Sequence, residues 1–464
     1  MCKDVLYLQK IIFKMKILLK NIGILTEAMF DFSKDLIILC GPNNTGKTYA
    51  AYSIYGIYSL AQNNRRRKPI KGRTLQTFEE DGSISLNIED FFNEVKKQFI
   101  KEYEDSFIKF LPSLFAADDS FFKDSQISIQ IEDKDIINDI YTKGFKNQIK
   151  LGSNLTIQLE KAPESLICEI ITIQEGPQHS VFKSLGAELV YDTLIELFSQ
   201  SIFNHVYITP AERSAINIFS RELSVRRNAI IDELLELREK KSEIDPLKKV
   251  QRYPLPIRDS LAIAEDLGNL QKEKSDFEFL ANRLEEYVLK GKIKVSKEGD
   301  LQFTPNKGKV KNLNIHLTAS IVKSLSNLVF YFRHLAKKGD FIIIDEPELN
   351  LHPDNQRIIA RFLGEIVNNG FKVMISTHSD YIIRELNNMI MLHSGGDKAK
   401  ELISKYEYKD YQLLDYNRVG SYLFKTNKNV SLEMSETGFE VSTIDEEINK
   451  LNRTSEDIYF SLFD

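Results

Sequence analysis

The sequence predicts an α/β fold in which a mixed sheet is flanked by helices, with a β-rich lobe and an inserted helical arm. Two observations carry the α/β prediction: the apolar blocks at 36–40 and 341–344 each run directly into a polar motif, and helical patterns follow both. Short, fully apolar blocks of this kind are typical of strands buried on both faces of a sheet. A third observation, the charged helical stretch at 220–289, predicts the arm.

Composition places the chain among ordinary globular proteins. It has 464 residues, 28% charged residues and a net charge of −5, which does not favour obligate nucleic-acid binding. Its three cysteines (Cys2, Cys40 and Cys168) have no metal-ligand spacing, and no apolar run is long enough for a transmembrane helix. The apolar N-terminal residues are broken by lysines and do not read as a signal peptide. We expect a cytoplasmic protein without a membrane partner.

The first motif, GPNNTGKT at 41–48, has the spacing of a phosphate-binding loop between a strand and a helix. Glycines let the backbone wrap a phosphate, and the helix N-terminus favours its negative charge. We expect Lys47 to reach the β- and γ-phosphates of ATP and Thr48 to bind Mg²⁺. The predicted nucleotide-binding residues are Gly41, Asn43, Asn44, Thr45, Gly46, Lys47 and Thr48. A chance match in an ordinary turn is the alternative.

The middle of the chain alternates between strand and helix patterns. Segments 83–88, 127–132 and 155–160 alternate as half-exposed strands do, and 90–110 is an amphipathic helix. Residues 205–210 form a further buried-strand candidate, and 292–303 reads as a hairpin. We divide the chain into residues 15–219, the first part of a head with the phosphate loop; 220–291, the helical arm; and 292–464, the second part of the head with a short tail.

The second motif, FIIIDEP at 341–347, places two carboxylates at the end of a buried strand. Ligand sites of open α/β sheets lie at that edge. We expect Asp345 to hold Mg²⁺, mostly through water, and Glu346 to activate the attacking water as general base. An acidic turn with no catalytic role is the bland alternative, and pairing with GPNNTGKT favours the functional interpretation.

The third motif, ISTHSD at 375–380, ends the next predicted strand. An imidazole there can hydrogen-bond a phosphate oxygen or the attacking water, so His378 is a candidate γ-phosphate sensor. A single histidine is more often structural, but its place after the strand that follows Asp345 favours the sensor.

The combination of GPNNTGKT, FIIIDEPELNLHPDNQ and VMISTHSDYIIREL resembles the ABC-type ATPases, among them the RecF, Rad50 and SMC heads and the overcoming-lysogenization-defect (OLD) family. DEPELNLHP followed by STHSD is closer to the OLD-like and RecF-like group than to transporters. The resemblance implies an ABC-ATPase-like P-loop head that hydrolyses ATP, slowly, with Mg²⁺. It also implies at least a homodimer or a higher homo-oligomer, because each site of this class takes residues from two subunits.

The resemblance assigns further residues. Ser320, in IHLTASIVKSLSNL, is similar in position to the signature serine that contacts the nucleotide of a second subunit, although the signature glycines are absent. It also suits a plain helix N-cap. Asn350 and His352 would lie in the loop that communicates across the dimer. Arg213, in YITPAERSAI, would lie near the nucleotide or the dimer interface.

The length and the tail at 439–460 look similar to ATPase subunits of bacterial two-gene anti-phage systems of the PARIS and Septu types. This implies a phage-derived trigger and a separate, nuclease-like effector, since the residues after His378 leave no room for a built-in TOPRIM nuclease. A DNA-binding repair ATPase of the RecF or Rad50 type is the alternative. A transporter subunit is a third, which the signature region disfavours.

Nucleic acid is an open partner. The basic run RRRKPIKGR at 65–73 could contact phosphates, as could Arg221, Arg226 and Arg227, but a charge run is more often a solvated loop.

Overall fold

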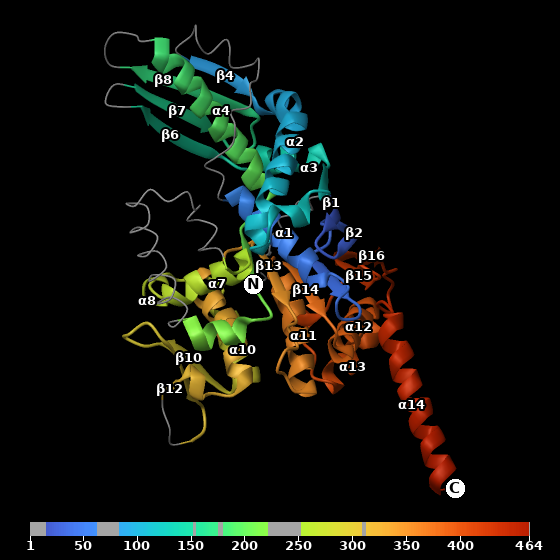
Figure 1. Cartoon of the computed structure of the whole chain (residues 1–464). Helices are drawn as coiled ribbons and strands as arrows, with labels where there is room; N and C mark the ends of the chain where they lie inside the picture. Colours follow the sequence, from blue (N-terminus) through green and yellow to red (C-terminus); the bar gives the residue numbers. More distant parts are fainter. Residues whose placement is uncertain are drawn as a thin grey trace, which may run out of the picture.

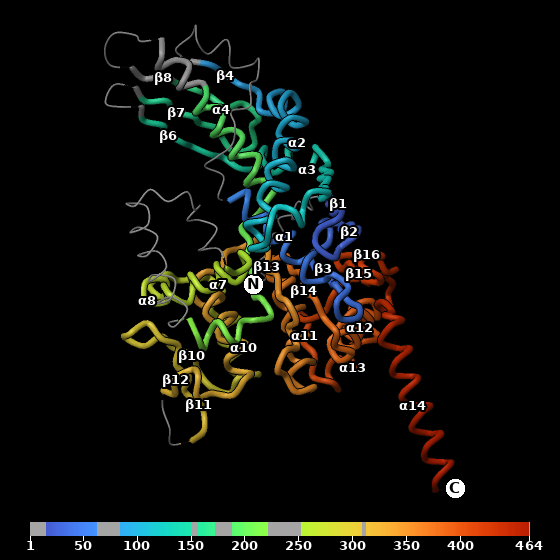
Figure 2. Tube along the Cα trace, in the orientation of Figure 1, coloured from blue at the N-terminus to red at the C-terminus, as the bar shows by residue number. Residues whose placement is uncertain are grey.

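The computed structural model describes residues 15–62, 83–151, 155–174, 180–220, 252–308 and 312–463, which Figure 2 shows in colour. The basic run at 65–73, Arg221, Arg226, Arg227 and the residues before Met15 lie outside these ranges.

A nine-stranded mixed sheet forms the centre of the molecule (Figure 1). Its strands, in spatial order, are β5 (Gln126–Ile131), β1 (Met15–Ile22), β2 (Leu25–Asp31), β16 (Lys428–Ser431), β15 (Val419–Lys425), β3 (Leu36–Cys40), β14 (Lys372–Thr377), β13 (Phe341–Asp345) and β9 (Val206–Thr209). The run from β15 to β9 is parallel, while β5, β1 and β2 are antiparallel. The predicted α/β fold with a mixed sheet flanked by helices is confirmed.

The parallel strands separate two hydrophobic cores. All five residues of β3 are buried, and successive side chains of a strand point to opposite faces. Ile37 and Leu39 therefore enter one core, and Leu36 and Ile38 enter the other. The first core is completed by α1 (Lys47–Gln62), α2 (Ile88–Phe115) and α4 (Ser180–Ile202), and the second by α10 (Ser320–Phe330), α11 (Pro353–Asn368) and α12 (Asp380–Ser394).

A separate four-stranded antiparallel sheet forms the β-rich lobe. Its strands are, in spatial order, β4 (Ser83–Asn87), β8 (Ile167–Gln174), β7 (Leu155–Lys161) and β6 (Phe145–Leu151). It lies with α4 at one end of the molecule, and α3 (Asp133–Thr142) lies closer to the central sheet (Figure 1). The strand expected at 127–132 does not belong to this lobe, because β5 pairs with β1 at the edge of the central sheet.

The described part of the expected helical arm packs onto the head. It contains α7 (Leu255–Glu265), α8 (Leu267–Leu270), α9 (Glu278–Arg283) and a π-helical turn at Leu284–Leu289. Leu280 and Leu284 are buried in the second core. A three-stranded sheet follows, formed by β10 (Gly291–Val295), β11 (Leu301–Pro305) and β12 (Leu313–Asn314), and its first two strands form the hairpin expected at 292–303.

The helix that precedes β13 changes its geometry along its length. α10 begins at Ser320, and a π-helical turn continues it over Tyr331–Leu335. The short helix α13 (Lys400–Lys405) follows α12, and α14 (Ser442–Phe463) extends away from the head without a buried residue (Figure 1). None of the helices in the described part of the chain has the length and apolarity needed to span a bilayer.

Candidate functional site

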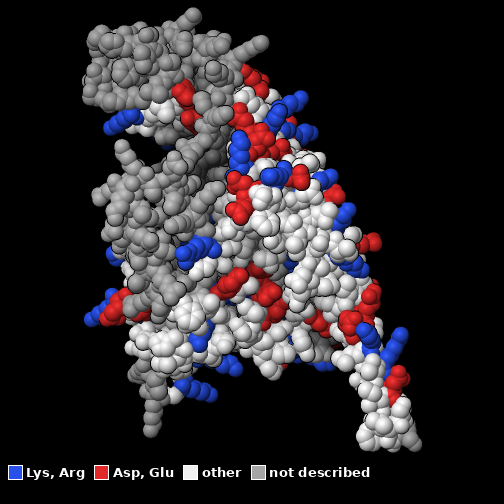
Figure 3. Space-filling view, viewed as in Figure 1, with Lys and Arg blue, Asp and Glu red and all other residues white. Residues whose placement is uncertain are grey.

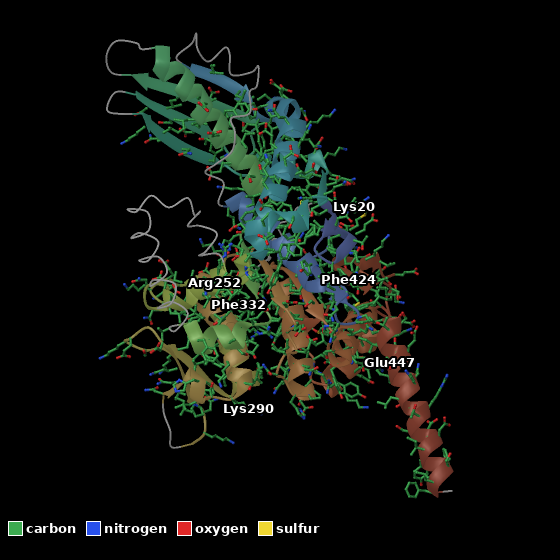
Figure 4. All side chains as sticks on the ribbon, viewed as in Figure 1. Lys20, Arg252, Lys290, Phe332, Phe424 and Glu447 are labelled. Atoms are coloured by element: carbon green, nitrogen blue, oxygen red, sulfur yellow. The ribbon has the colours of Figure 1, made fainter. Side chains whose placement is uncertain are left out.

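The loop between β3 and α1 is a tight backbone turn. Gly41 has φ +129° and Gly46 has φ +99°, conformations that side chains rarely adopt. A Cβ atom at Gly41 would lie 2.5 Å from the backbone oxygen of Phe424, so β15 passes directly beside the loop. Phe424, which belongs to β15, is labelled among the side chains in Figure 4. Asn43 and Asn44 are exposed at the tip of the loop, and the Thr45 hydroxyl donates to the Pro42 oxygen at 2.8 Å.

Lys47 folds back over this loop. Its ammonium donates to the backbone oxygens of Gly41 at 2.9 Å and of Pro42 at 2.6 Å, and its side chain is buried. Burial lowers the pKa of Lys47 to about 8, although Asp345 and Glu346 act in the opposite direction. The loop thus holds a desolvated cation, which interacts strongly with any anion that reaches it.

Thr48 and Asp345 face each other from α1 and β13. The Thr48 hydroxyl donates to Asp345 Oδ2 at 3.3 Å, and the Ser376 hydroxyl donates to Asp345 Oδ1. Asp345 is only 1% exposed, and burial raises its pKa while the bonds from Ser376 and Thr48 act against that. Adjacent carboxylate and hydroxyl oxygens are ligands that Mg²⁺ accepts. The residues present therefore fit the Mg²⁺ expected from the sequence.

Glu346 adopts a left-handed backbone conformation, with φ +52°. This conformation is uncommon for a residue other than glycine, and the surroundings must hold it. The Glu346 N–H donates to the Ser376 backbone oxygen and to its hydroxyl, each at 3.1 Å. In contrast to Asp345, the Glu346 side chain is 34% exposed and remains open to solvent.

Arg213 fixes the same turn from the opposite side. Its guanidinium donates to the backbone oxygens of Asp345 at 2.7 Å, Glu346 at 2.6 Å and Pro210 at 3.1 Å. The residue is 1% exposed. It lies beside the candidate site, and its side chain is an internal brace, because burial leaves it no surface to offer to another subunit.

His378 follows β14 and lies next to Glu346. Its Nε2 is 3.7 Å from Glu346 Oε1. Burial and the charge of Lys47 lower the pKa of His378, and Glu346 acts in the opposite direction. A neutral imidazole beside a solvent-exposed carboxylate can donate or accept a hydrogen bond with a water placed between them.

Glu348 is a site residue that sequence reasoning missed. Its Oε1 accepts hydrogen bonds from the His378 N–H at 2.6 Å and from the Thr377 hydroxyl at 2.9 Å. Burial raises the pKa of Glu348. The only sequence signal was a second glutamate shortly after Glu346, and such a residue is normally assigned to a solvated turn.

The remaining predicted residues lie apart from this group. Asn350 donates to the Ser324 hydroxyl on α10 at 3.3 Å. His352 is exposed and is the N-cap of α11. Ser320 is exposed as the first residue of α10, and Ala319 holds the cap position, so the N-cap alternative for Ser320 is wrong.

The family model described as the AAA ATPase domain matches residues 15–383. This range contains every residue of the candidate site. The comparison with curated proteins found no match.

Solved structures of SMC heads are among those similar to the chain. A Smc head bound to the C-terminal winged-helix domain of ScpA shares 10% identity, covers 91% of this chain and 98% of its own, and has a TM-score of 0.33. A Smc head with an extended coiled coil, bound to the C-terminal domain of ScpA from Pyrococcus furiosus, shares 13% identity. The match covers 94% of this chain and 99% of that structure, with a TM-score of 0.31. The SMC head domain from Thermotoga maritima shares 10% identity. The match covers 91% of this chain and 99% of that structure, with a TM-score of 0.29.

Proposed function

The chain belongs to the AAA ATPase domain family, and from this premise we propose that it binds ATP with Mg²⁺ and hydrolyses it slowly as a regulatory switch. The observation that supports this best is the convergence of Lys47, Thr48, Asp345, Glu346 and His378 at the carboxyl edge of three adjacent parallel strands. This edge is where open α/β sheets bind ligands.

The division of labour follows from the two neighbouring carboxylates. Asp345, buried and bonded to Thr48, would hold Mg²⁺, which supplies charge compensation for the phosphates when bound. Glu346 is accessible to water and would take the proton of the attacking water at its carboxylate. His378 would hydrogen-bond that water or the terminal phosphate, and Lys47 would neutralise the β- and γ-phosphates.

We propose further that two or more copies share each site, and that ATP binding controls a separate effector. Ser320, Asn350 and His352 are exposed, and an exposed position is a requirement for contact with a second copy. The proposed setting is bacterial anti-phage defence in the cytoplasm, with a nuclease-like effector and a phage-derived trigger. This part rests on the sequence resemblance alone.

A DNA-repair ATPase of the RecF type is the alternative. It needs a continuous basic surface for phosphates. On the face shown in Figure 3, acidic and basic side chains of the described residues are interspersed. No observation on these residues favours the alternative over the switch.

The test is light scattering of the wild-type protein, Glu346→Gln and Lys47→Ala, each with and without ATP and Mg²⁺, followed by phosphate release. We expect Glu346→Gln to bind ATP and gain mass but release no phosphate. Lys47→Ala should neither bind ATP nor gain mass. If the wild-type protein neither binds ATP nor changes mass, and Lys47→Ala behaves identically, the proposal fails. DNA-dependent assembly of the wild-type protein would favour the repair alternative.

A further inference from the structure

The Glu348 carboxylate lies between the turn after β13 and the turn after β14. One oxygen accepts both the His378 N–H, at 2.6 Å, and the Thr377 hydroxyl, at 2.9 Å. The other oxygen, Oε2, is buried and has no hydrogen-bond partner among the described residues. Burying an incompletely satisfied carboxylate costs free energy, which the two donors on Oε1 offset only in part.

The contact fixes the backbone that carries His378. The Thr377 hydroxyl, which donates to Glu348, also accepts the Ser379 N–H at 3.1 Å. Ser379 in turn caps α12 through the Ile382 N–H. The turn from Thr377 to Ser379 is therefore tied to Glu348 on one side and to the helix on the other, which leaves the His378 backbone little freedom.

The His378 side chain then points to the reacting region. Its Nε2 lies 3.7 Å from Glu346 Oε1, and this distance depends on both turns. Glu348 is two residues from Glu346 along the chain and accepts the backbone N–H of His378, so it links the two groups directly. Ser376, at the end of β14, also connects these two segments. It accepts the Glu346 N–H, and its hydroxyl donates to the Asp345 carboxylate.

We infer that Glu348 is a positioning residue for hydrolysis, which acts by holding the His378 imidazole against Glu346. This inference rests on the proposed ATPase function. It assigns Glu348 no contact with nucleotide or metal. Its contribution is the placement of His378, so its effect must disappear when the imidazole is removed.

The test is a double-mutant cycle on kcat, KM and nucleotide affinity, with Glu348→Ala, His378→Ala and the double variant. We expect Glu348→Ala to lower kcat by roughly 10- to 100-fold, the usual range for supporting groups of an active site, with nucleotide affinity nearly unchanged. The double variant should be no slower than His378→Ala alone. Glu348→Gln keeps a carbonyl oxygen for the two donors and should restore most of the rate.

Glu348→Asp is the second variant if Glu348→Ala does not fold. It keeps the charge but withdraws the oxygen by one carbon, so it should lose kcat in the same His378-dependent way. Additive losses in the double variant, or an unchanged kcat in His378→Ala, would overturn the inference. Failure of the proposed function is distinct, because then Glu346→Gln would leave phosphate release unchanged as well.

Discussion

At the scale of single residues, the two carboxylates after β13 differ through their surroundings. Asp345 is buried and bonded to two hydroxyls, while its neighbour Glu346 is turned to solvent by a left-handed backbone. Under the proposed function, this arrangement suits Asp345 to metal binding and Glu346 to proton transfer. The residue types Asp and Glu alone do not predict which of the two is buried.

Arg213 braces that backbone, and its removal should be costly. Arg213→Met removes the guanidinium donor from the backbone oxygens of Pro210, Asp345 and Glu346. The Pro210 oxygen keeps the backbone N–H of residue 213 and the Glu346 oxygen keeps the Leu349 N–H, so the Asp345 oxygen loses most. We expect a loss of about 1–3 kcal/mol in the free energy of unfolding, which is the usual cost of leaving a buried acceptor without its donor. Urea denaturation measures it. The exposed Arg384→Met is the matched control, and an equal loss in both variants would contradict the brace.

Glu385 should make stability depend on acid pH. Burial raises its pKa, but hydrogen bonds from Arg361 at 2.5 Å, Tyr408 and Arg357 at 3.0 Å outweigh burial and leave the pKa below its usual range. A depressed carboxyl pKa contributes stability that is present above the unfolded pKa of about 4.3 and is lost as the pH falls through the folded value.

We therefore expect Glu385→Gln to lower the free energy of unfolding at neutral pH by about 1–3 kcal/mol, and the gap to wild type to close below about pH 4. Chemical denaturation across this pH range measures it. Asp380→Asn removes the more exposed pair with Arg384 and should cost less than about 1 kcal/mol. A stability difference between wild type and Glu385→Gln that does not change with pH would contradict a lowered pKa of Glu385.

At the scale of elements, close packing limits α11. A Cβ atom at Gly364 would lie 2.2 Å from the backbone oxygen of Gln412. Gly364→Ala should therefore destabilise by about 1–3 kcal/mol, because a backbone atom cannot yield as a side chain can. Gly268→Ala in α8 meets its nearest atom at 4.0 Å and should be neutral or slightly stabilising. Thermal unfolding of both variants separates the two expectations.

α14 should contribute little to global stability. None of its residues is buried, and Leu451, Ile458 and Leu462 are more than half exposed. Ile444 in its first turn packs against the second core, but a helical segment without tertiary packing opens easily. Hydrogen exchange should be fast over 451–463 and slow in α1, and deletion of residues 451–464 should shift Tm by no more than about 1 °C. Protection of α14 equal to that of α1 would contradict this.

The elements that sequence patterns predict well are those buried on both faces. β3 and β13 fall within a residue of their expected bounds, because a short uninterrupted apolar block is typical of a strand buried on both faces. The partner of a strand is a tertiary matter, so the sheet to which β5 belongs could not be predicted. β15, which lies beside β3, was not predicted at all.

The candidate site divides in the same way. The phosphate-loop and carboxylate motifs can be recognised in the sequence by their spacing, and their residues meet at one sheet edge. The inner position of Arg213 and the bridge from Glu348 to His378 depend on which turns touch. No local pattern encodes those contacts.

At the scale of the whole molecule, ligand binding should stabilise the folded chain. ATP with Mg²⁺ at 100 times its Kd adds about 2.7 kcal/mol, which corresponds to a rise in Tm of several degrees. Lys47→Ala should abolish the rise, because it removes the cation that closes the loop. Differential scanning fluorimetry with the exposed Lys97→Ala as control measures it. A rise that persists in Lys47→Ala would place the nucleotide elsewhere.

The place of β15 has a consequence for synthesis on the ribosome. β3 carries the phosphate loop, yet its neighbours are β14 and β15, which the ribosome makes hundreds of residues later. Until residues 419–425 emerge, β3 is an edge strand and Gly41 lacks the backbone of Phe424 beside it. A nascent chain therefore completes the loop after β3 late in translation, and fragments truncated before β15 carry the motif without the strand that packs against it.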